Sequence, residues 1–123
     1  GHQGKAMMVC IDKATAVRMY DKVQAHWKAY LARLKAELAN APQELQAALK
    51  HKISVLEDTD MAVVVSQGQN EVTQLADKGL DILPHRKRMV DDELDERFKD
   101  ADDPLRLVFV CAMWITGFDV PSC

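Results

Sequence analysis

Three short runs of apolar residues divide the chain, and each predicts a buried β-strand. They are residues 6–11 (AMMVCI), 61–65 (MAVVV) and 105–111 (LRLVFVC). Each run is nearly continuous instead of alternating with polar residues. In the third run, such continuity is typical of a strand that is covered on both faces, as in a parallel sheet.

Between these runs, apolar residues recur at steps of three and four and predict amphipathic helices. A long helix is expected after Asp12, whose carboxylate can cap it, to about Leu38. Asn40 and Pro42 then mark a break before a second, shorter helix. Residues 85–99 also have helical character, with a few apolar positions amid heavy charge.

The resulting order, β, α, α, β, α, α, β, predicts an α/β fold. Strands that alternate with helices form a parallel sheet with the helices packed against it. Three strands make a thin sheet for such a fold, and the chain stops soon after the third, before a helix could cover it. We therefore expect a part of a larger domain.

Composition and charge narrow the classes of function. The 123 residues suffice for one small domain, and 48% hydrophobic with 28% charged residues argues against disorder. The net charge of −3 gives no overall attraction to nucleic acid or to an anionic membrane. Any contact with DNA must therefore be local.

The cysteines and the absence of long apolar runs bear on the cellular compartment. Cys10, Cys111 and Cys123 are widely spaced and odd in number, which favours a reducing cytoplasm. No run approaches the roughly 20 apolar residues that a membrane-spanning helix needs, so no membrane partner is expected. Residues 1–3 are interpreted as the remnant of a tag or linker.

Polar turns follow the second and third strands and are the candidate functional sites, because ligands of open α/β sheets bind outside the carboxyl ends of the strands. The candidates are Ser66, Gln67 and Gly68 after the second strand, and Thr116, Gly117 and Asp119 after the third. Their hydroxyl, amide and carboxylate groups suit phosphate or ribose contacts. Ordinary connecting loops, in which these groups bond their own backbone, remain the alternative.

The compact basic cluster of Arg86, Lys87 and Arg88 could touch a DNA backbone. A solvated helix face is the favoured interpretation, because a run of acids follows at once. The histidines do not cluster with cysteines at ligand spacing, so no metal site is expected.

Three segments carry a resemblance to a known family: GKAMMVCID, MAVVVSQGQN and, above all, ERFKDADDPLRLVFVCAMWITGFDVPS. They resemble the second RecA-like domain in the motor subunit of type I restriction enzymes, a superfamily 2 helicase-type translocase. The resemblance is close over residues 94–122 and looser elsewhere. It implies a partial RecA-like (P-loop NTPase-type) three-layer fold over residues 4–123, running from helicase motif IV to motif V.

The same resemblance implies roles for the turn residues. Thr116 would contact a DNA phosphate together with Ser66, Gln67 and Gly68, while Gly117 and Asp119 of motif V would couple the bound nucleotide to DNA. The implied partners are double-stranded DNA, the first RecA-like domain of the same chain, and the modification and specificity subunits of a type I complex. Ala112 departs from the family, whose members commonly have an acid there.

The chain lacks the motifs of a complete enzyme. It has no GxxxxGK[ST] loop and no DExx-type acidic motif, and neither motif VI nor the paired acids of a nuclease is present. The resemblance therefore implies a parent site-specific deoxyribonuclease that uses ATP and Mg²⁺, of which this fragment alone holds no cofactor and is inactive. The alternatives are another superfamily 2 helicase, or a stand-alone flavodoxin-like module that binds a nucleotide or a protein.

Overall fold

The computed structural model of the chain describes residues 5–111. The interpretation of residues 1–3 and the proposed roles of Thr116, Gly117 and Asp119 lie outside this range. The chain divides into two compact units. We call the first the sheet unit; it consists of the described residues of Gly1–Tyr20 and Asp60–Cys123. We call the second, Asp21–Thr59, the helical unit.

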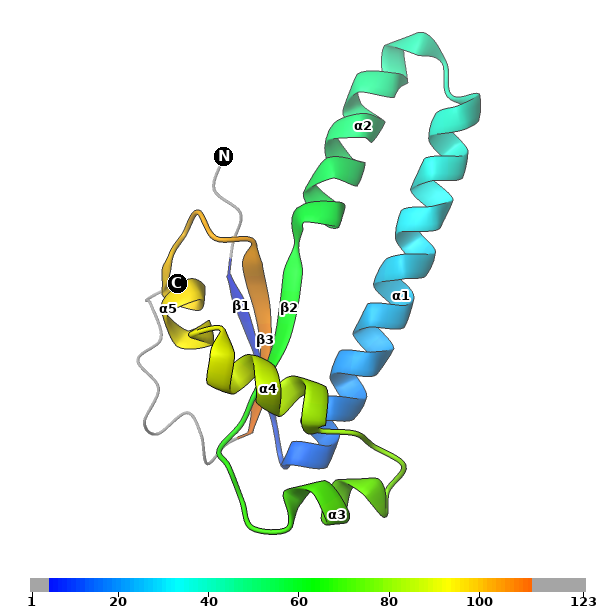
Figure 1. Cartoon of the computed structure of the whole chain (residues 1–123). Helices are drawn as coiled ribbons and strands as arrows, with labels where there is room; N and C mark the ends of the chain where they lie inside the picture. Colours follow the sequence, from blue (N-terminus) through cyan, green and yellow to red (C-terminus); the bar gives the residue numbers. More distant parts are fainter. Residues whose placement is uncertain (1–4, 112–123) are drawn as a thin grey trace. The chain divides into compact units, whose positions relative to one another are not determined.

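A three-stranded parallel sheet forms the centre of the sheet unit and confirms the α/β prediction. It consists of β1 (Ala6–Cys10), β2 (Asp60–Val64) and β3 (Leu105–Cys111), in the order β1-β3-β2 (Figure 1). The register pairs Cys10 with Cys111 and Val64 with Val110. All three carboxyl ends therefore reach the same edge of the sheet.

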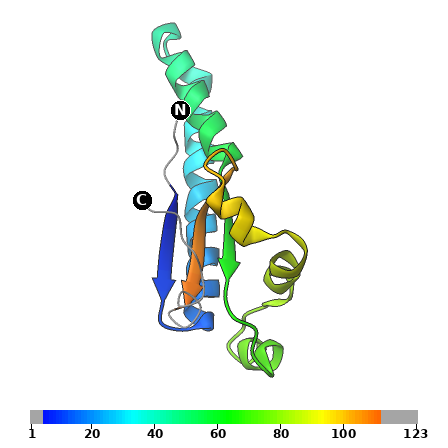
Figure 2. The ribbon, with the colours of Figure 1, turned by 90° about the vertical axis from the view of Figure 1, so that its left-hand side faces the viewer.

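Both faces of β2 and β3 are covered, as their continuous apolar runs predict, whereas β1 is partly exposed. On one face, Ala62, Val64, Val108 and Val110 pack with Leu94 and Phe98 of α5 (Leu94–Lys99). On the other face, the ring of Phe109 meets Tyr20 edge to face, with centroids 5.8 Å apart. Tyr20 belongs to the first turns of α1 (Lys13–Asn40), which lie behind the strands in Figure 2, with α5 in front.

Three helices connect β2 to β3, one more than the sequence predicts. They are α3 (Glu71–Ala76), α4 (Leu83–Asp91) and α5. The prediction of one continuous helix over residues 85–99 is wrong, because Glu93 adopts a left-handed conformation with φ of 46°. This residue is the N-cap of α5 and redirects the chain after α4, so that α5 can pack on the sheet.

The long helix and its successor follow the sequence pattern closely. The Thr15 N–H donates to the Asp12 carboxylate at 2.8 Å, which confirms Asp12 as the cap of α1. Pro42 stands directly before α2 (Gln43–Asp58). Within the helical unit, the Trp27 indole donates to the Leu56 carbonyl at 3.0 Å and ties the two helices together.

Candidate functional site

A pocket of about 380 Å³ opens at the carboxyl ends of the strands, and we refer to it as the strand-end pocket. The segments that follow β1 and β2 and the last residue of β3 contribute to it, in agreement with the parallel topology. Its lining consists of Ile11, Asp12, Lys13, Ala14, Ser66, Gln67, Gly68, Glu71, Gln74, Leu75, Lys78 and Cys111. The pocket thus combines an apolar wall with two lysines, two carboxylates and the loop of residues 66–68.

The 66–68 loop lies where the sequence predicts a site. Ser66, Gln67 and Gly68 all line the strand-end pocket, and the Gln67 side chain is exposed. These three residues therefore lie at the carboxyl edge of the sheet. Their contact with DNA stays a prediction.

The second predicted turn, with Thr116, Gly117 and Asp119, lies outside the described residues. Cys111, the last residue that the structure describes, lines the strand-end pocket. Thr116, the first residue of that turn, follows Cys111 by five residues in the sequence.

The wall of the strand-end pocket includes a buried carboxylate that no motif in the sequence indicates. Glu71 is only 7% exposed, and Arg86 holds both of its oxygens, Nη2 at 2.7 Å from Oε1 and Nε at 2.8 Å from Oε2. Hydrogen bonds from Arg86, which outweigh the opposing effect of burial, lower the pKa of Glu71. Lys13 adds an ion pair at 3.6 Å. Glu71 is therefore charged at neutral pH and fully paired.

No local signal in the sequence marks Glu71. It lies 15 residues from Arg86, in a different helix, among ordinary polar residues. The only usable hint is its place in the first turn of a short helix directly after a strand-end loop, where carboxylates are generally favourable.

The favoured interpretation of the basic cluster as a solvated helix face is wrong for Arg86 and Arg88. Both reach inward from α4 to the edge of β2, where Arg88 donates to the Met61 carbonyl at 2.8 Å and to Asp60 at 2.7 Å. Lys87, between them, is exposed. Arg88 thus satisfies a carbonyl of the edge strand β2, and Arg86 satisfies the carbonyls of Val65 and Ser66 directly after it.

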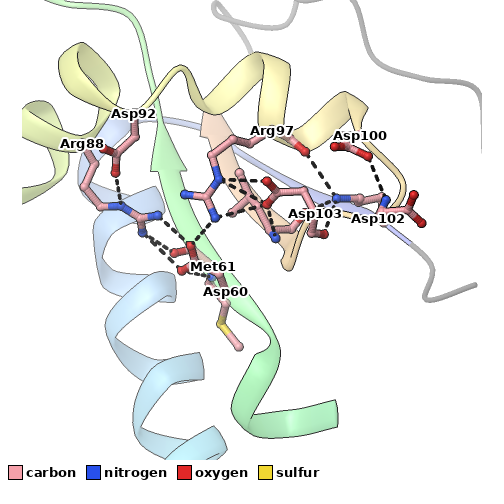
Figure 3. A network of polar contacts seen from close by, with 10 residues as sticks. Asp60, Met61, Arg88, Asp92, Arg97, Asp100, Asp102 and Asp103 are labelled. Atoms are coloured by element: carbon pink, nitrogen blue, oxygen red, sulfur yellow. Dashed lines mark hydrogen bonds and ion pairs between the residues drawn. The ribbon is translucent and has the colours of Figure 1, made fainter. Parts of the chain in front are cut away.

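A second charged network lies at the opposite, amino end of the strands (Figure 3). The Asp60 carboxylate accepts hydrogen bonds from Arg88 and, at 3.0 Å, from Arg97. Arg97 also donates to Asp103 at 3.1 Å. Burial alone would raise the pKa of Asp103, but hydrogen bonds from Arg97 and from the Leu105 N–H bring it below its usual value. This network joins α4, α5 and the starts of β2 and β3.

The described part of the chain contains neither a cluster of metal ligands nor a candidate membrane-spanning helix. Among residues 5–111, no three His, Cys, Asp or Glu side chains converge as metal ligands would. Within the same range, no helix has both the length and the apolar character that crossing a bilayer requires.

The chain is similar to endonuclease subunits of type I restriction enzymes. A proposed type I restriction enzyme endonuclease subunit, MjaIXP of Methanocaldococcus jannaschii, is 29% identical over 119 residues, which are 96% of this chain and 8% of that protein. The type I restriction enzyme HindI endonuclease subunit of Haemophilus influenzae is 60% identical over 30 residues, 24% of this chain and 3% of that protein. The chain thus spans less than a tenth of either relative.

No protein-family model matches the chain. No solved structure matches it at a significant level either.

Proposed function

We propose that the chain is part of the second RecA-like motor domain of a type I restriction endonuclease subunit. The observation that supports this most directly is the similarity to the M. jannaschii subunit over 96% of the chain. The parallel sheet and its strand-end pocket agree with such a domain. This similarity favours the restriction enzyme over another superfamily 2 helicase or a stand-alone flavodoxin-like module.

In the complete subunit, the strand-end pocket would face DNA and nucleotide. The 66–68 loop and Thr116 would bind the phosphate backbone, and Gly117 and Asp119 would link that contact to the state of the nucleotide. A glycine in such a turn allows the backbone to approach a phosphate closely. The result would be a coupling between ATP hydrolysis and movement along duplex DNA.

The catalytic groups for ATP would come from elsewhere in the subunit. This sequence contains neither a GxxxxGK[ST] loop nor a DExx-type motif, so ATP and Mg²⁺ would be held mainly by the first RecA-like domain. By itself the fragment would be inactive. The full enzyme would work with modification and specificity subunits, in the cytoplasm.

One exposed edge of the sheet agrees with a larger domain. Val9 of β1 is 51% exposed and Ile11, just after it, is 87% exposed. Large apolar side chains at a sheet edge are ordinarily covered by neighbouring elements. Further strands of a complete RecA-like domain would cover Val9, whereas Ile11 lines the strand-end pocket.

The test uses the complete endonuclease subunit assembled with its modification and specificity subunits. We expect Thr116→Ala and Asp119→Ala each to lower DNA-stimulated ATP hydrolysis and translocation about tenfold or more, a loss of about 1.4 kcal/mol of transition-state stabilisation. Glu44→Ala, at an exposed position of α2, serves as the control and should leave both rates unchanged. Wild-type rates in both turn variants would refute the assigned roles.

A further inference from the structure

Glu71 and Arg86 form a latch, a carboxylate and guanidinium pair whose members also bind the backbone of the 66–68 loop. Arg86 donates Nη1 to the Val65 carbonyl and Nη2 to the Ser66 carbonyl, each at 3.2 Å. The Gly68 N–H donates to Oε1 of Glu71 at 3.1 Å. The start and the end of the loop are therefore tied to the same ion pair.

Lys13 connects this latch to the segment that follows β1. Its ammonium lies 3.6 Å from Oε1 of Glu71 and also lies against Gly68, where an added Cβ would be only 2.6 Å from Nζ. Because Gly68 has no Cβ, the Lys13 ammonium can occupy this space. Because Lys13 and the loop both line the strand-end pocket, one buried carboxylate orders two parts of its wall.

The latch differs from an ordinary surface ion pair in burial and in geometry. The side chains of Glu71 and Arg86 are 8% and 16% exposed, and their contact is bidentate. A buried pair of this kind contributes little net stability compared with apolar residues, but removal of one partner leaves an unpaired buried charge. Its role here is to restrict the 66–68 loop to a single conformation through its hydrogen bonds to the loop backbone.

We infer that Glu71 is a positioning residue, which fixes the 66–68 loop and Lys13 in the arrangement that grips the phosphate backbone of DNA. This inference rests on the proposed motor function, because it takes DNA as the ligand of the strand-end pocket. Glu71 itself would touch no DNA. It would act through the loop carbonyls and the Gly68 N–H that the latch holds.

The first experiment measures loop order in this chain directly. We expect Glu71→Gln and Arg86→Lys each to speed amide hydrogen exchange at Gly68 about tenfold or more, because the neutral amide and the single ammonium cannot reproduce the bidentate contact. Arg88→Lys is the matched control. Arg88 lies on the same helix and holds Asp60 and Met61 in a similar way, but at the opposite end of β2.

A merely structural role for Glu71 predicts a different result. Exchange at Gly68 would then follow global stability, and Arg88→Lys would accelerate it as much as Arg86→Lys for an equal loss of stability. Unchanged exchange in Glu71→Gln, or equal exchange in the two arginine variants, would overturn the inference.

The second experiment uses the complete subunit in its enzyme complex and separates affinity from turnover. We expect Glu71→Gln to raise the DNA concentration for half-maximal ATP hydrolysis about tenfold, with the maximal rate within about twofold of wild type. Gly68→Ala should act in the same direction, since it displaces Lys13 while the Glu71 and Arg86 pair stays intact. Arg88→Lys should leave this concentration unchanged.

Thr116→Ala, assayed in parallel, distinguishes the two hypotheses. If Thr116→Ala impairs DNA-stimulated hydrolysis while Glu71→Gln leaves half-saturation by DNA unchanged, the positioning role is wrong and the motor function stands. If neither variant changes any DNA-dependent rate, the proposed function itself fails, and the inference fails with it.

Discussion

At the scale of single residues, Lys5 shows how one charge can serve the fold instead of a ligand. Its ammonium donates to the Leu105 carbonyl and, at 2.9 Å, to the Asp103 carbonyl, and it lies 5.7 Å from the centroid of the Phe98 ring. Burial lowers the pKa of Lys5, against the attraction of Asp103. The lysine therefore caps the amino end of the sheet by satisfying carbonyls of the segment that enters β3.

Replacement of Lys5 by methionine tests this capping role. We expect Lys5→Met to lower the free energy of unfolding by about 1.5–3 kcal/mol, the usual worth of hydrogen bonds from a charged donor. Lys87→Met, at an exposed position of α4, should change it by less than about 0.5 kcal/mol. Chemical denaturation followed by circular dichroism provides the measurement. Equal effects of the two substitutions would contradict the capping role.

At the scale of elements, the break between α4 and α5 separates two tasks. Arg88 of α4 covers the edge of β2, whereas Leu94 and Phe98 of α5 pack on the face of the sheet. A straight helix could not direct its side chains to both places. The left-handed residue Glu93 supplies the change of direction, although this conformation is unfavourable for a residue with a Cβ atom.

Glycine at the break should therefore stabilise the chain. We expect Glu93→Gly to raise the free energy of unfolding by about 0.5–1 kcal/mol, because relief of the left-handed strain exceeds the entropy that glycine adds to the unfolded chain. Asn70, with φ of 61°, provides the comparison, and Asn70→Gly should have a smaller effect because asparagine tolerates this conformation. Thermal and urea unfolding measure both. A destabilised Glu93→Gly variant would show that the break carries no strain.

At the scale of the whole molecule, charged networks occupy both ends of β2 in the sheet unit. Arg86 and Glu71 lie at the carboxyl end, and Arg88, Arg97, Asp60 and Asp103 at the amino end. Figure 3 shows the second of these, whose members come from β2, α4, α5 and the turn before β3. The sheet unit thus depends on carboxylates that must stay ionised.

This dependence predicts acid sensitivity. Glu71 and Asp103 have lowered pKa values in the folded chain, so the unfolded chain binds protons more readily at low pH. Their stabilisation should be complete above the unfolded pKa values, about 4, and should be lost as the pH falls through the lower folded values. We expect unfolding free energies measured between pH 6 and pH 2 to fall less steeply for Asp103→Asn than for wild type. Parallel curves would show that Asp103 does not contribute.

Most of the elements could be predicted from local patterns, and most of the side-chain partners could not. The strands follow from apolar runs, and the cap of α1 follows from Asp12, because both depend on residues close together in the chain. The division of residues 85–99 depends on where Phe98 must pack, which no local pattern records. For the same reason, Arg88, which acids follow in the sequence, resembled a solvated charge. In the fold it bonds to Asp60 and Met61 of β2.

The sequence by itself determined the α/β class, the three parallel strands and the position of the 66–68 loop at a strand end. Apolar runs and the spacing of apolar residues are sufficient to predict these features, because they indicate which residues are buried. Only the tertiary structure decided that Glu71 meets Arg86, 15 residues away, and that Arg88 meets Asp60, 28 residues away. Such pairs form only after the helices have packed along the sheet, because the packing brings the charges together and excludes the water that would otherwise separate them.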